Sequence, residues 1–106
     1  MKKILYNKLV RDRIPEIIQE AGKTCVCSPV EGPVLLNYAK KKLLEEVNEF
    51  LEDPCAEEAA DVMEIFHLLC DLYEIKDSHI MAQSTAKRIT KGAFAKGLVL
   101  SWVIEK

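Results

Sequence analysis

The sequence lacks a long apolar run, since no stretch approaches the ~20 residues that a helix needs to cross a bilayer. Its first residues are basic but no long apolar segment follows them, so they do not predict a signal peptide. The formal net charge of −2 also lacks the basic excess that binding to a nucleic-acid polymer requires. We therefore expect a cytoplasmic protein that binds neither a membrane nor a nucleic-acid polymer.

Internal repeats and low-complexity segments are absent as well. The 106 residues are enough for one compact domain but not for two, so we expect a single domain over residues 1–106. Hydrophobic residues make up 49% of the chain, which allows a core to form. A chain this short nevertheless gains much from association with further copies of itself.

The chain has four cysteines, and in a cytosolic chain these are expected to be reduced. Cys25-x-Cys27 together with His67-x-x-Cys70 suggests a zinc site only as a weak alternative, because a CxC pair alone has little specificity. Cys70 also falls near the predicted core.

Lysine and arginine are absent from residues 45–74, whereas this stretch holds eleven of the 17 acidic residues. Within it lie two spaced pairs, Glu46-x-x-Glu49 and Glu58-x-x-Asp61. Residues three or four apart share a face of a helix. Two helices folded back on each other would therefore bring four carboxylates together, and such a group requires positive charge among them.

Apolar periodicity predicts four helices. The first lies between a cap at Asp12 and a stop at Gly22, and the others span about residues 34–51, 55–74 and 78–91. Asp53-Pro54 separates the second helix from the third, because proline excludes the helical conformation from the residue before it. The short connection predicts that these two helices pack as an antiparallel pair.

The last segment, residues 93–106, has apolar side chains at every second position, which is the period of a strand. These residues are Leu98, Leu100, Trp102 and Ile104. The segment could pair with Ile4–Tyr6. The expected fold class is thus all-α, a helical bundle built on an antiparallel helix hairpin, with a small terminal β-pair as an addition.

An acidic run on a helix is usually a solvated face. Glu58 and Asp61 depart from this rule, because each lies four residues before an apolar residue of the predicted core stripe, Val62 and Ile65. A buried carboxylate without a partner is costly. These two side chains are therefore expected to have a positively charged partner.

Glu46 flanks the apolar stripe of the second helix, and Glu49 follows one turn later. The hairpin itself offers no basic residue, so we predict that a cation binds among Glu46, Glu49, Glu58 and Asp61. Hard divalent ions take oxygen ligands, and Mg²⁺ typically combines a few carboxylates with substrate phosphates. We expect Mg²⁺, with Mn²⁺ as an alternative, and either one ion or two.

Further residues are candidates for catalysis and substrate binding. Glu45 and Glu57 flank the carboxylate pairs and could hold or deprotonate an attacking water, against the alternative that both are simply exposed. Lys8, Arg11 and Lys91 are candidates for binding phosphate, since a triphosphate carries more charge than Mg²⁺ alone neutralises. The alternative for these three is a solvated basic surface.

The motifs Glu45-Glu46-x-x-Glu49 and Glu58-x-x-Asp61 resemble the signature of the all-α NTP pyrophosphatases, the MazG-like superfamily, which includes phosphoribosyl-ATP pyrophosphohydrolase and the all-α dUTPases. Residues 6–18, Tyr-Asn-Lys-Leu-Val-Arg-Asp-Arg-Ile-Pro-Glu-Ile-Ile, resemble the opening motif of a subgroup of small MazG-like or phosphoribosyl-ATP pyrophosphohydrolase-like proteins. Residues 91–94 and 99–100 resemble the closing segment of that subgroup. The linker between the carboxylate pairs is shorter than in many members.

This resemblance implies a Mg²⁺-binding helical bundle that forms homodimers or homotetramers. The implied activity is hydrolysis of a nucleoside triphosphate at the α–β phosphate link, which releases pyrophosphate and a nucleoside monophosphate. It also implies that Glu46, Glu49, Glu58 and Asp61 are the metal ligands. The alternatives are a phosphoribosyl-ATP pyrophosphohydrolase-like activity and a non-catalytic acidic helical module that binds a basic partner.

Overall fold

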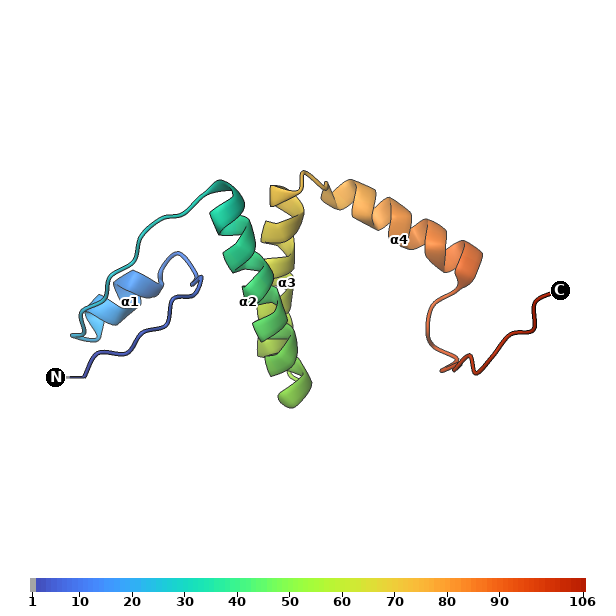
Figure 1. The fold of residues 1–106 in the computed structure, drawn as a ribbon, viewed down its shortest axis with the longest axis horizontal. Helices are drawn as coiled ribbons and strands as arrows, with labels where there is room; N and C mark the ends of the chain where they lie inside the picture. Colours follow the sequence, from blue (N-terminus) through green and yellow to red (C-terminus); the bar gives the residue numbers. More distant parts are fainter. Residues whose placement is uncertain (1) are drawn as a thin grey trace. The chain divides into compact units, whose positions relative to one another are not determined.

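The computed structural model describes residues 2–106, and these residues form four helices and no strand. In chain order the helices are α1 (Ile14–Glu20), α2 (Gly32–Glu52), α3 (Ala56–Leu72) and α4 (Asp77–Lys91), as Figure 1 shows. The expected all-α class is confirmed. The chain divides into two compact units, one that ends at Glu74 and one that spans Ile75–Lys106. The expectation of a single domain stays a prediction.

The expected terminal β-pair is wrong, because neither residues 93–106 nor Ile4–Tyr6 form a strand. Alternating side chains suit a strand, but a strand becomes stable only as part of a sheet. Gly92 and Gly97 have positive φ angles of 85° and 60°, a conformation that glycine adopts readily and that interrupts an extended run. The four alternating apolar side chains of the tail are all exposed: Leu98, Leu100, Trp102 and Ile104.

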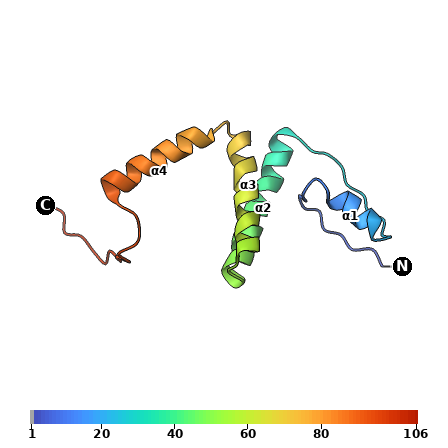
Figure 2. The same cartoon turned by 180° about the vertical axis from the view of Figure 1, so that it is seen from behind.

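Helices α2 and α3 form the antiparallel hairpin that the sequence predicts, and they lie side by side in both ribbon views (Figures 1 and 2). A proline lies in the first turn of α2, where its missing N–H removes no helical hydrogen bond. At the other end, Asp53 leaves the helical conformation immediately before Pro54. Helix α3 ends at Leu72, two residues earlier than predicted, and Glu74 adopts a φ of 58°.

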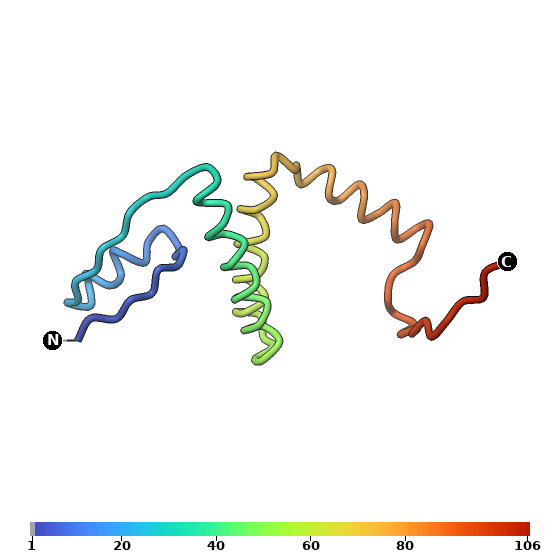
Figure 3. Tube along the Cα trace, viewed as in Figure 1, coloured from blue at the N-terminus to red at the C-terminus, as the bar shows by residue number. Residues whose placement is uncertain are grey.

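Helix α1 is a short element that precedes the hairpin. A proline occupies its first turn, and Gly22, with a φ of 79°, follows its end as the sequence predicts. The chain then runs without regular structure from residue 23 to residue 31, where α2 is about to begin (Figure 3). The segment before α1 is also irregular, but Leu9 anchors it by packing against the core of the hairpin.

The hydrophobic core is small and lies between α2 and α3. Ala39 on α2 faces Ile65 and Leu69 on α3, and these three are buried. Partly buried apolar side chains surround them: Leu9, Leu36, Leu43, Leu68 and Leu72. Removing such side chains from water is the main source of stability of the hairpin.

A second apolar surface of the hairpin is left exposed. On α2, Leu44 and Leu51 lie seven residues apart, which is two helical turns, and each is 67% exposed. On α3, Met63 and Phe66 lie three residues apart and are also exposed. We call these four residues the apolar face.

A contact between the two helices shows that the four residues of the apolar face lie on the same side of the hairpin. The ammonium group of Lys40 on α2 lies 6.0 Å from the ring centroid of Tyr73, directly after α3. Lys40 is four residues before Leu44, and Tyr73 is seven residues after Phe66, so each shares a helical face with that residue. The exposed apolar side chains of both helices therefore lie on one side of the hairpin.

The second unit contains α4 and the tail. No residue of α4 is buried, and the helix ends before Gly92, as predicted. Within residues 2–106, none of the helices combines the length and the apolar character that a membrane crossing requires.

The small core makes a direct prediction about stability. Ile65→Ala should lower the free energy of unfolding by about 2–4 kcal/mol, because it removes a buried side chain whose space the neighbours cannot refill. Leu98→Ala, at an exposed position of the tail, is the matched control and should change it by less than about 0.5 kcal/mol. Urea unfolding of the three proteins measures both effects, and equal losses would contradict the assigned core.

Candidate metal centre

Three of the four predicted metal ligands converge on the inner edge of the hairpin. Glu46 on α2 and Glu58 and Asp61 on α3 each offer a carboxylate oxygen, and these oxygens all lie within 4.8 Å of one another. We call these three residues the acidic triad. A single ion at the centre of such a group could contact all three.

Glu46 is the residue of the triad that most requires a counterion. Its exposed fraction is 6%, and it is the only buried charged residue among residues 2–106. Its neighbours in the triad, Glu58 and Asp61, are half-buried. A carboxylate withdrawn from water in this way is stable only with compensating positive charge or hydrogen bonds.

Two buried oxygens of the triad lack that compensation. Oε2 of Glu46 and Oε2 of Glu58 have no hydrogen-bond partner. Buried polar atoms are rarely left without a partner, so each such atom indicates an unfilled interaction. A hydrogen-bond donor or a cation satisfies such oxygens, and because both belong to neighbouring carboxylates, a cation also offsets their charge. The residues present therefore fit a metal ion.

The sequence-based statement that the hairpin offers no basic residue is wrong. Lys42 on α2 lies four residues before Glu46, and its Nζ is 3.1 Å from Oε1 of Glu46 and 3.7 Å from Oε2 of Glu45. Spacing of four residues places the two side chains on one helical face. This spacing predicts the pair from sequence alone, and Lys42 lies just before residues 45–74, the stretch that lacks lysine and arginine.

The segment before α1 supplies two more cations. Nζ of Lys8 donates a hydrogen bond of 2.8 Å to Oε1 of Glu45, and Nη2 of Arg11 donates one of 2.7 Å to Oδ1 of Asp61. The bond from Lys8 holds the pKa of Glu45 below its ordinary value and raises the pKa of Lys8. The bond to Asp61 likewise raises the pKa of Arg11.

Glu49, the fourth predicted ligand, lies outside the triad. It interacts with Glu46 on the same helix, and hydrogen bonding and repulsion between the two carboxyl groups raise the pKa of Glu49. The pKa of Glu58 is also raised, first by loss of solvation and then by the negative charges of Asp61 and Glu46. Glu49 and Glu58 thus hold protons more tightly than ordinary carboxyl groups do.

Charge balance indicates how much positive charge is still missing. Five carboxylates meet here, those of the triad with Glu45 and Glu49, whereas Lys8, Arg11 and Lys42 supply three positive charges. With all groups ionised, two negative charges remain, which equals the charge of one divalent cation.

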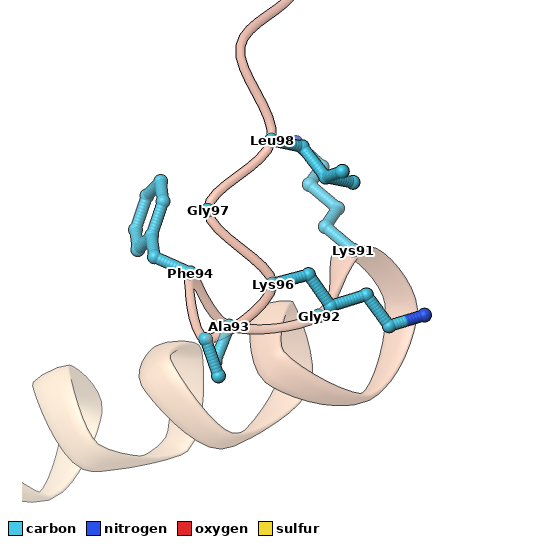
Figure 4. A pocket seen from close by; sticks show the side chains of 8 residues that line it. Lys91, Gly92, Ala93, Phe94, Lys96, Gly97 and Leu98 are labelled. Atoms are coloured by element: carbon cyan, nitrogen blue, oxygen red, sulfur yellow. The ribbon is translucent and has the colours of Figure 1, made fainter.

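The other predicted functional residues lie in different surroundings. Glu45 is half-buried and paired with two lysines, while Glu57 is exposed in the first turn of α3. Lys91 belongs to the second unit, where it ends α4. There it lines a hollow of about 350 Å³ together with Gly92, Phe94 and neighbouring residues (Figure 4).

The cysteines and histidines do not form a comparable group. Within residues 2–106, the acidic triad is the only cluster of three side chains suited to a metal ion. Cys70 is buried in the hairpin, whereas Sγ of Cys25 lies 3.9 Å from the carbonyl oxygen of Pro15 near α1. The zinc alternative therefore has no support in the geometry.

Comparison with known proteins gave no match among protein-family models, curated proteins or solved structures.

The raised carboxyl pKa values predict how stability depends on pH without metal. Folded Glu58 and Glu49 retain protons that the unfolded chain has released, so the free energy of unfolding should fall as pH rises above 4.5. Glu58→Gln should flatten that decline, because glutamine does not titrate. Glu45 has the opposite effect in the wild type and in Glu58→Gln alike. Its pKa is lowered by folding, so the stability it contributes is lost as pH falls through its pKa in the folded state.

Urea unfolding between pH 4.5 and pH 8 in the presence of a chelator measures the slopes. Glu52→Gln removes an exposed carboxylate of α2 and is the matched control, with an expected slope like that of the wild type. A decline as steep in Glu58→Gln as in the wild type would show that the pKa of Glu58 is not raised by folding.

Proposed function

We propose that this chain is a divalent-metal-dependent nucleotide pyrophosphohydrolase of the MazG-like all-α superfamily. The observation that carries the proposal is the buried Glu46, which has one unpartnered oxygen and groups with Glu58 and Asp61 of the neighbouring helix. The sequence motifs containing these residues resemble the metal-binding motifs of that superfamily. Mg²⁺ is the proposed ion, with Mn²⁺ as an alternative, because all the available ligands are carboxylate oxygens.

The proposed reaction is hydrolysis of the α–β phosphate link of a nucleoside triphosphate. Water attacks the α-phosphorus, and its oxygen remains on the nucleoside monophosphate. The bond between the α-phosphorus and the bridging oxygen breaks, and pyrophosphate leaves with the bonding electron pair. A divalent ion supplies polarisation of a phosphoryl oxygen and acidification of bound water. The triad residues would hold this ion, with Glu49 available as a further ligand.

The remaining side chains contribute positioning and charge. The lowered pKa of Glu45 keeps it ionised, so it can accept a hydrogen bond from the attacking water. Glu57 is the alternative acceptor. Lys8 and Arg11 would bind phosphate oxygens, and the planar guanidinium of Arg11 suits a bidentate contact. Lys91 remains a further proposed phosphate ligand.

Turnover of a nucleotide panel tests this proposal. Wild-type protein with Mg²⁺ should release pyrophosphate and a monophosphate from at least one of the common NTPs, dNTPs or phosphoribosyl-ATP. Asp61→Asn and Glu46→Gln should each lower the rate at least about 100-fold, because each removes charge from the triad. Glu52→Gln, which removes an exposed acid from the same hairpin, should retain activity.

Two outcomes would contradict the assignment in different ways. Equal turnover by the wild type and Asp61→Asn would remove the triad as the active site. No turnover of any nucleotide, combined with tight binding of a basic protein partner, would favour the non-catalytic acidic module.

We also propose that the chain forms a homo-oligomer through the apolar face, with a dimer as its basic unit. Leu44, Leu51, Met63 and Phe66 would pack against the same residues of a second hairpin and give a four-helix bundle. The spacing of three and seven residues is the one that helix pairs use for such packing. The acidic surface is unsuited to this contact, since two copies of it would repel each other.

Substitution of the apolar face should separate the copies. Leu44→Lys combined with Met63→Lys should convert a dimer or tetramer into a monomer, because lysine at the centre of an apolar contact loses solvation without gaining a partner. Analytical ultracentrifugation measures the mass, and Leu98→Lys at an exposed tail position is the control. An unchanged mass for the double variant would place the interface elsewhere.

A further inference from the structure

The residues before α1 lie across the acidic site and contact both helices of the hairpin. Lys8 bonds to Glu45 on α2 and Arg11 bonds to Asp61 on α3, at 2.8 and 2.7 Å. Between them, Leu9 packs against the hydrophobic core. We call residues 8–11 the cationic arm. An apolar anchor with a cation on each side fixes the arm over the carboxylates.

Arg11 binds a residue that is also a proposed metal ligand. The contact uses Oδ1 of Asp61, one of only two oxygens that this side chain can offer to an ion. The side chain of Arg11 is more than half exposed, so its guanidinium can leave Asp61 without moving the core. Lys42 differs, because it is mostly buried beside Glu46 on α2 and is part of the hairpin itself.

We propose that the cationic arm is a displaceable counterion: it offsets part of the negative charge of the acidic site when no metal is bound, and it transfers Arg11 and Lys8 to the substrate phosphates when metal and substrate bind. This inference rests on the proposed function, since it assigns a regulatory step to the same site. A metal ion at the triad supplies the charge that Asp61 otherwise takes from Arg11. The released guanidinium would then be free to donate hydrogen bonds to phosphate oxygens of the substrate.

Competition for Asp61 gives the reason for the exchange, because Arg11 bonds to an oxygen of a proposed metal ligand, and the charge balance sets how many ions the site accepts. With the arm in place, the five carboxylates and three cations leave a deficit of two, which one divalent ion fills. With both arm cations withdrawn, the deficit is four, which matches two divalent ions. Movement of the arm thereby couples the number of ions bound to the availability of Lys8 and Arg11 for phosphate.

The exchange predicts opposite effects of one substitution on two ligands. Arg11→Gln should bind Mn²⁺ alone about fivefold more tightly than the wild type, because the ion no longer competes with an ion pair for Asp61. The same variant should bind inorganic pyrophosphate in the presence of Mg²⁺ about tenfold more weakly, because a charge-assisted contact is lost. If Arg11 had a merely structural role, its substitution would weaken the binding of both ligands or of neither.

Arg13→Gln is the matched control, because it removes the same charge two residues along the chain. Arg13 bonds to Glu16 on α1 at 3.1 Å and has no contact with the triad. Both affinities should equal those of the wild type. Isothermal titration calorimetry of the three full-length proteins, first with Mn²⁺ and then with pyrophosphate and Mg²⁺, measures all of them.

Each remaining outcome counts against the inference. Unchanged or weaker Mn²⁺ binding by Arg11→Gln would show that the arm does not compete with the ion. Tighter Mn²⁺ binding with unchanged pyrophosphate binding would show that Arg11 does not bind phosphate after it leaves Asp61. Both results leave the proposed activity intact if the wild type still turns over nucleotides. Absence of Mn²⁺ binding in every protein would overturn the proposed function together with the arm.

Discussion

The rest of this structure depends on one electrostatic constraint, which is the burial of Glu46 between two helices that carry further carboxylates. Glu58 and Asp61 face it from α3, and two oxygens of the group have no partner. Lys42 compensates part of the charge from within α2. A core this small offers little excess stability to offset uncompensated charge, and a cation held by the triad would supply the missing compensation.

The hairpin has two surfaces of different chemistry. One carries the acidic triad and the cationic arm, and the other carries the exposed apolar face beside Lys40 and Tyr73. Burial of the apolar face by a second copy would add the hydrophobic stabilisation that the isolated hairpin lacks. It would also leave the acidic surface open, so association and ion binding do not compete for the same residues.

Local patterns in the sequence predicted the hairpin and most of the candidate site. Pro54 set the break between the helices, and spacing relative to Val62 and Ile65 placed Glu58 and Asp61 toward the core. Other features could not be obtained in this way. Glu49 lies outside the triad, whereas the same three-residue spacing keeps Glu58 and Asp61 together, so spacing alone does not distinguish the two pairs. The bonds from Lys8 and Arg11 join residues 37 and 50 positions apart, and helical periodicity carries no information on such contacts. Alternation in the tail indicated a strand but not a neighbour to pair with.

The position of a bound ion tests the central claim most directly. A crystal of the protein grown with Mn²⁺, measured at a wavelength where manganese scatters anomalously, locates that ion without assumptions about its ligands. The account predicts an anomalous peak about 2.0–2.4 Å from carboxylate oxygens of Glu46, Glu58 and Asp61. A structure in which manganese binds only elsewhere, or in which these three side chains point apart into solvent, would contradict it.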